Sequence, residues 1–109
     1  MTIAIIVAMD KELQLLLPLL SEPRTTVIDG ITFYLGDTGT NSLIIMKSGI
    51  GKVNAALATM QLIRQFAPDL VVNTGVAGGT GSDARILDIV VGERIAYHDV
   101  WCGPDTVEG

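Results

Sequence analysis

The stretch "TIAIIVAMDKEL", residues 2–13, decides the fold class. Its first eight residues are almost all apolar and rich in β-branched side chains, which is typical of a strand buried on both faces. From Met9 onward, leucines recur at helical spacing, so residues 10–20 are expected to form a helix that Pro18 ends or kinks. A buried strand that leads directly into a helix indicates an α/β protein.

The rest of the chain continues this alternation. Asp29-Gly30 divides two β-rich runs, and this dipeptide is the strongest short hairpin signal in the sequence. Further strands are expected over residues 42–48 and 69–75, the second of them buried, with a helix over 51–66 that stops before Pro68. Strands that alternate with helices predict a sheet that is parallel in part.

The pattern of apolar residues leads to two further predictions. The second expected helix is amphipathic, because five apolar side chains lie along one of its faces: Val53, Ala56, Leu57, Met60 and Ile63. The run "RILDIVVGERIAYHDV", residues 85–100, predicts one or two closing strands, with a β-bulge at Gly92.

Composition excludes several classes of function. The 109 residues carry 12 acidic and 7 basic side chains, a net charge of −5, and no basic cluster that could bind nucleic acid or an anionic membrane. A single cysteine indicates a reducing cytoplasm, and one histidine with one cysteine cannot supply a metal site. No apolar run approaches the roughly 20 residues of a membrane span. The apolar fraction of 49% is high for so short a chain, so we expect extensive association or a share in a larger core.

The glycines of "KSGIGKVNAALA", residues 47–58, pose the question of a phosphate-binding loop. The P-loop pattern requires glycine at position 46 and a hydroxyl residue at position 53, but the chain has Met46 and Val53. Both mismatches argue against a nucleoside triphosphate site. Either the glycines serve a tight strand-to-helix turn that Ser48 caps, or they let a ligand approach the backbone around Ile50.

The carboxyl ends of two expected strands, Ala8-Met9 and Gly75 to Gly79, should lie along one edge of the sheet and frame one site. Glu12 follows Met9 by three residues, which places its carboxylate inside or beside the apolar stripe of the first helix. Two interpretations stay open. Glu12 is either a surface acid stabilised by the helix N-terminus or a general base.

Four segments together resemble a known family: "IIVAMDKEL", "KSGIGKVNAA", "NTGVAGG" and "LDIVVGERIAYHD". In order and spacing they are similar to the amino-terminal half of bacterial 5′-methylthioadenosine/S-adenosylhomocysteine nucleosidases, of the purine nucleoside phosphorylase superfamily. The resemblance implies an incomplete three-layer α/β/α sandwich around a mixed, partly parallel sheet, formed by residues 1–109 as a single truncated domain. It implies hydrolysis of the adenine–ribose bond without cofactor or metal.

The resemblance also implies residue roles. Glu12 would activate the attacking water, and Ala8, Met9 and Ile50 would line the site. Residues 76–78 (Val76, Ala77 and Gly78) would face the ribose and base. Many family members have serine where this chain has Val76, which weakens the case for phosphate as the nucleophile.

Family members are roughly twice this length, and their carboxyl half supplies a Met-Glu pair and an aspartate that the present 109 residues do not match. The resemblance further implies a cytoplasmic homodimer or higher homo-oligomer, with residues 51–66 and the segment around Val100 to Cys102 in the contact. The alternatives are a non-catalytic assembly module that binds purine nucleosides weakly, and a related enzyme such as a futalosine hydrolase.

Overall fold

The computed structural model describes residues 1–101, 103 and 104. The chain divides into two compact units, residues 1–77 and 78–109. All described helices and strands belong to the first unit. That residues 1–109 form one domain stays a prediction.

The first unit is built on a five-stranded sheet with the order β2-β3-β4-β1-β5. Strand β1 (Thr2–Val7) pairs in parallel with β4 (Asn41–Lys47) on one side and with β5 (Leu70–Asn73) on the other. Strands β3 (Ile31–Thr38) and β2 (Ser21–Ile28) extend the sheet beyond β4 in antiparallel pairing. The predicted mixed, partly parallel sheet is confirmed.

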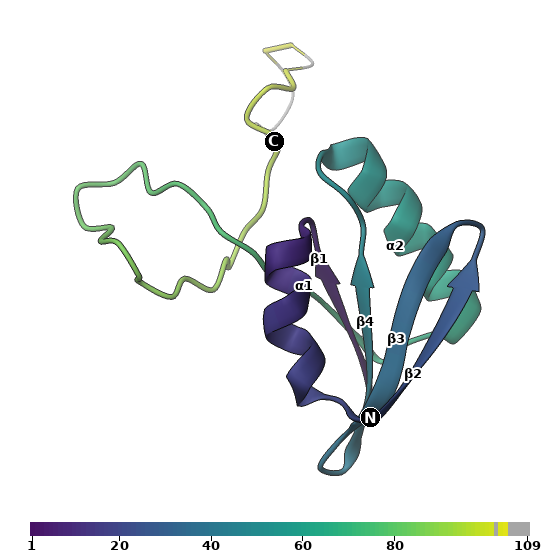
Figure 1. The fold of residues 1–109 in the computed structure, drawn as a ribbon. Helices are drawn as coiled ribbons and strands as arrows, with labels where there is room; N and C mark the ends of the chain where they lie inside the picture. Colours follow the sequence, from purple (N-terminus) through teal and green to yellow (C-terminus); the bar gives the residue numbers. More distant parts are fainter. Residues whose placement is uncertain (102, 105–109) are drawn as a thin grey trace. The chain divides into compact units, whose positions relative to one another are not determined.

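Two helices cover opposite faces of this sheet, as Figure 1 shows. Helix α1 (Asp10–Leu16) packs Leu13 against one face, where Leu43 and Ile45 of β4 point. Helix α2 (Lys52–Phe66) packs Ala58 and Leu62 against the other face. The alternation of side chains along each strand fills both cores, so the predicted three-layer α/β/α arrangement is confirmed.

Local sequence signals account for the boundaries of these elements. Asp29 and Gly30 have φ values of 49° and 80°, the left-handed pair that a two-residue hairpin turn between β2 and β3 requires. Helix α1 ends at Leu16, and Pro18 lies in a short 3-10 turn, Leu17–Leu19. Helix α2 ends in a left-handed Ala67 directly before Pro68, as predicted.

The predicted apolar stripe of α2 is not the face that packs on the sheet. Leu57 and Met60 are 66% and 59% exposed, whereas Ala58 and Leu62 are buried. The apolar residues of α2 extend around much of the helix, so the sequence pattern alone does not select the face that meets the sheet.

Strand β5 was predicted to be buried, but all four of its residues are exposed. It is the edge strand of the described sheet and pairs only with β1. An apolar, β-branched run therefore identified a strand correctly but not its place in the sheet.

The closing strands predicted over residues 85–100 are absent from the structure, which shows no helix or strand among the described residues beyond β5. Six apolar side chains between Ile86 and Ile95 are at least 80% exposed. A strand needs a neighbour for its backbone hydrogen bonds, and no described segment pairs with this run. Gly92 consequently lies in no β-bulge. In the described part of the chain, no helix is long and apolar enough to cross a membrane.

Candidate functional site

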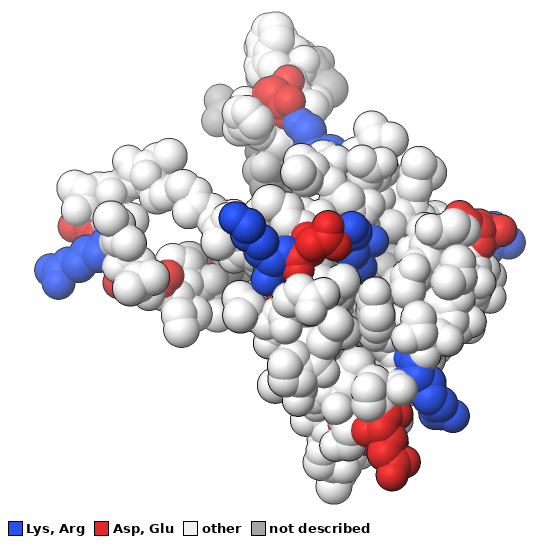
Figure 2. Space-filling model, in the orientation of Figure 1, with Lys and Arg blue, Asp and Glu red and all other residues white. Residues whose placement is uncertain are grey.

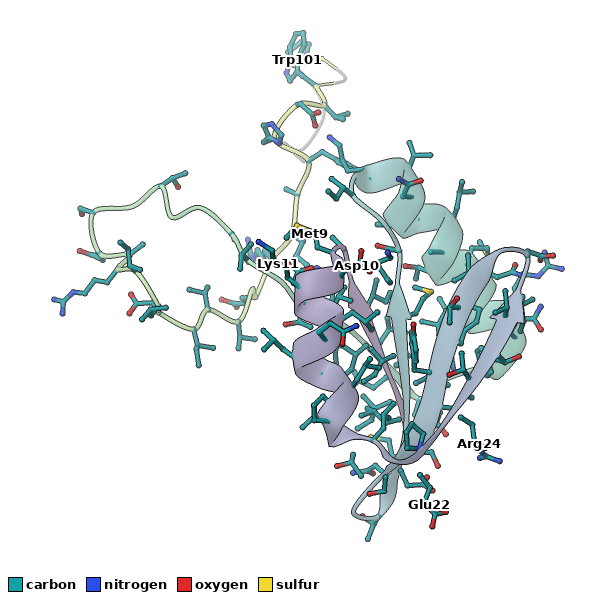
Figure 3. All side chains as sticks on the ribbon, viewed as in Figure 1. Met9, Asp10, Lys11, Glu22, Arg24 and Trp101 are labelled. Carbon is teal, nitrogen blue, oxygen red and sulfur yellow. The ribbon has the colours of Figure 1, made fainter. Side chains whose placement is uncertain are left out.

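The candidate site lies at the sheet edge where the three parallel strands end. Beyond the last pairs of β1, the N–H of Ser48 donates to Val7 O at 2.9 Å, and the N–H of Thr74 donates to Ile6 O at 3.0 Å. The segments that follow β4 and β5 therefore start on either side of the β1–α1 connection. Figure 3 shows Met9, Asp10 and Lys11 at the start of α1, whereas Glu22 and Arg24 lie at the opposite end of the sheet. Ligands of α/β sheets bind at the carboxyl-end edge.

The Glu12 carboxylate is fixed at this edge by backbone hydrogen bonds. Its Oε2 accepts hydrogen bonds from the N–H groups of Ala8, at 3.0 Å, and Met9, at 2.9 Å. Met9 is the N-cap of α1 and Glu12 its third helical residue, so the carboxylate satisfies a backbone donor that the helix leaves free. Glu12 is half-buried, with one oxygen fixed in place.

The second oxygen of Glu12 faces the segment after β5. A methyl group placed on Gly75 would lie 2.9 Å from Oε1 of Glu12. Beside these two residues is a pocket of about 170 Å³, with a largely apolar wall. Its lining comes from the end of β1, from α1 and from the segment after β5: Val7, Glu12, Leu15, Leu16, Thr74, Gly75 and Val76.

The structure brings part of the predicted residue set together. Ala8, Met9 and Glu12 are joined by hydrogen bonds, and Val76 lines the pocket beside Glu12. Ala77 ends the first unit without lining that pocket, and Gly78 belongs to the second unit.

Ile50 lies in the connection between β4 and α2 and is 72% exposed. The glycines on either side of it have positive φ, 84° at Gly49 and 101° at Gly51, so the tight turn requires them. Ser48 does not cap α2, because Gly51 is the N-cap and the single O–H of Ser48 is directed at two carbonyl oxygens, Gly49 O at 2.9 Å and Val7 O at 3.3 Å. The predicted cap by Ser48 is wrong.

A larger pocket of about 360 Å³ borders α1, the β2–β3 turn and the end of β4. It contains none of the predicted site residues. Lys47 lies at this pocket and forms an ion pair with Asp10, with Nζ 2.6 Å from Oδ1. Both side chains are substantially exposed, so the pair contributes little stability. Figure 2 shows acidic and basic side chains interspersed on the face that it draws.

Chemically, the Glu12 site suits proton transfer. One carboxylate oxygen is tied to two backbone amides, and the other is directed at Gly75 beside a pocket with apolar walls. A carboxylate fixed in this way can orient a water molecule and accept its proton. Among the residues that the structure describes, no three His, Cys, Asp or Glu side chains gather closely enough to hold a metal ion.

Sequence reasoning placed Gly75 at a strand end that frames the site but gave it no role, and it missed four other residues that line this pocket: Val7, Leu15, Leu16 and Thr74. The signal for Gly75 was present, because it is the first glycine after β5, but composition does not reveal which glycine faces a carboxylate. Leu15 is 79% exposed, and it did not belong to the leucines at helical spacing from which the first helix was predicted.

Comparison with known proteins by sequence and by structure indicates one family. The family model of the phosphorylase superfamily matches residues 2–107. A 5′-methylthioadenosine/S-adenosylhomocysteine nucleosidase of Listeria innocua is 43% identical over 100 residues, which cover 92% of this chain and 43% of the relative. The chain therefore spans less than half the length of this relative.

Two solved structures are similar to the present fold. The nucleosidase of Colwellia psychrerythraea in complex with adenine matches with a TM-score of 0.75 and 44% identity, over 78% of this chain and 35% of that one. A futalosine hydrolase mutant of Helicobacter pylori matches with a TM-score of 0.73 and 31% identity, over 78% of this chain and 37% of that one.

Proposed function

This chain belongs to the phosphorylase superfamily, and from that membership we propose that it carries the amino-terminal part of a purine nucleosidase site. The reaction is hydrolysis of the N-glycosidic bond of 5′-methylthioadenosine and S-adenosylhomocysteine, with release of adenine. The observation that carries the proposal is the Glu12 carboxylate, which is anchored through Oε2 and presents Oε1 at the pocket edge. The names of the relatives support the choice of substrates.

The proposed chemistry balances without a cofactor. The water oxygen forms a bond to C1′ of the ribose while the bond from C1′ to the adenine nitrogen breaks, and its electron pair leaves with the base. Oε1 of Glu12 accepts a proton from the water and later returns it to solvent, and the departing adenine takes up one proton from solvent. The transition state has oxocarbenium character, as in other glycoside hydrolysis.

We propose that the other predicted residues belong to the same site. Ala8 and Met9 hold Glu12 through their N–H groups, and Val76 presents a methyl-bearing side chain beside it. We place Ala77 and Gly78 along the ribose and base, and Ile50 at the exposed turn beside the end of β1. Val76 brings no hydroxyl to the site, which favours water over phosphate as the nucleophile.

Release of the nucleobase from a panel of nucleosides tests this proposal. We expect release from 5′-methylthioadenosine and S-adenosylhomocysteine in phosphate-free buffer, with no increase when phosphate is added. Preference for futalosine would identify the related hydrolase, and a strict need for phosphate would identify a phosphorylase. Nucleoside binding without any adenine release would instead support a non-catalytic assembly module.

We further propose that the protein is a cytoplasmic homodimer or higher homo-oligomer that buries the exposed face of α2. The apolar side chains on that face are large and accessible, with Val53 72% and Leu57 66% exposed. An apolar surface of this kind is typical of an interface. The second expected contact, around Val100 to Cys102, falls partly outside the described residues, because Cys102 is not among them.

The oligomer is tested by light scattering on a matched pair of variants. Leu57→Lys introduces a charge on the apolar face and should convert the oligomer to a monomer at micromolar concentration. Gln65→Lys adds the same charge at an exposed polar position of α2 and should leave the mass unchanged. A monomeric parent chain, or an unchanged mass for Leu57→Lys, would refute this contact.

A further inference from the structure

We propose that Gly75 is a positioning residue for Glu12, because the absence of a side chain at position 75 keeps the free carboxylate oxygen in its place. This inference rests on the proposed function, in which that oxygen accepts the proton. It assigns a role to Gly75, which the sequence placed at the end of a strand that frames the site but without a function of its own.

The backbone does not explain glycine at this position. Gly75 is not among the glycines with positive φ, so its conformation is open to other residues. The space around it is the constraint. A Cβ at position 75 would lie 2.9 Å from Oε1 and 3.5 Å from Cδ of Glu12. The first of these distances is shorter than ordinary van der Waals contact between carbon and oxygen.

The Glu12 carboxylate cannot move aside without loss. Its Oε2 is held by the N–H groups of Ala8 and Met9, at 3.0 and 2.9 Å. Helix α1 is itself fixed, because Leu13 is buried and its N–H donates to Met9 O at 3.1 Å. A methyl group at position 75 would therefore rotate the end of the Glu12 side chain and break one or both hydrogen bonds.

We expect Gly75→Ala to fold with a misplaced Glu12 carboxylate. The atom in conflict is the far end of one side chain, so the strain is relieved by rotation of Glu12 and not by a shift of the sheet. A displacement of about 1 Å at a reacting group can cost about 100-fold in rate. Gly75 thus acts on the reaction through Glu12.

The first test compares Gly75→Ala with Gly81→Ala. Gly81 lies in the same glycine-rich stretch, has no positive φ, and has open space where a Cβ would be. In Gly75→Ala, we expect the amides of Ala8 and Met9 to exchange with deuterium roughly threefold to tenfold faster, the scale of one lost hydrogen bond. Gly81→Ala should leave both rates unchanged. Unchanged exchange in Gly75→Ala as well would overturn the proposal.

The second test is a double-mutant cycle on adenine release, measured with a radiolabelled adenine nucleoside. Gly75→Ala should lower kcat by about 10- to 100-fold with little change in KM. In a Glu12→Gln background, the same substitution should have almost no further effect, because its target is already gone. Independent, multiplying losses would show that Gly75 does not act through Glu12.

The two tests separate failure of this inference from failure of the proposed function. A parent chain that releases no adenine would count against the proposed function. The exchange rates of the Ala8 and Met9 amides would then show by themselves whether Gly75 positions the Glu12 carboxylate.

Discussion

In the proposed function, Glu12 combines a structural and a chemical role, and the two roles use different oxygens. Oε2 caps the start of α1 through the N–H groups of Ala8 and Met9, while Oε1 is directed at Gly75. The sequence could not choose between a helix-stabilising acid and a general base, because a carboxylate in the first turn of a helix is compatible with both. The geometry shows that one side chain can serve both purposes.

The structural role is open to a stability measurement. Glu12→Ala removes the acceptor of two backbone N–H groups and should lower the free energy of unfolding by about 1 kcal/mol. Glu12→Gln keeps an oxygen acceptor at the third helical position, so its free energy of unfolding should stay within about 0.5 kcal/mol of the parent. Urea unfolding followed by circular dichroism measures both values. Equal stability of the Ala variant and the parent would mean that the cap contributes nothing.

At the scale of elements, the strength of the local signal decided which predictions succeeded. Asp29-Gly30 predicted the β2–β3 hairpin because a two-residue turn needs left-handed residues at both positions. The face of α2 and the exposure of β5 depend on neighbours that no local pattern encodes. The run over residues 85–100 has the composition of a strand but pairs with no described segment. Its high β-propensity therefore did not produce a strand.

The corrected face of α2 leads to a matched pair of substitutions. Leu62 is fully buried against the sheet, so Leu62→Ala should lower the free energy of unfolding by about 2 to 5 kcal/mol. Leu57 is largely exposed, so Leu57→Ala should change the free energy of unfolding by less than about 0.5 kcal/mol. Denaturant unfolding, at a dilution where light scattering shows a monomer, gives both values. A larger effect at Leu57 than at Leu62 would contradict the observed packing.

At the scale of the whole molecule, the sequence predicted the fold class and the family, and the comparisons support both. The candidate site was predicted in part. Position along strand ends indicated Ala8, Met9 and the segment from Gly75 onward, whereas the part that Gly75 plays became visible only from the direction of the Glu12 side chain. The 109 residues span 43% of the Listeria innocua relative.

Adenine release by the 109-residue chain should therefore be slow. Hydrolysis needs an activated water, a stabilised ribosyl cation and a protonated leaving base, and the described residues offer a candidate only for the first. General acid assistance alone is typically worth about 100- to 10,000-fold in rate. We expect turnover at least about a thousandfold below that of the full-length relative, measured with 5′-methylthioadenosine. A rate within tenfold would show that residues of this chain supply the other two functions.

The central claim is that the Glu12 carboxylate activates water, and the turnover of Glu12→Gln tests it most directly. Gln keeps the helix cap but cannot accept a proton, so the melting temperature should stay close to that of the parent. Adenine release from 5′-methylthioadenosine should fall by about 100-fold or more, the scale of a lost general base. Release within threefold of the parent, in a variant of unchanged melting temperature, would contradict the account.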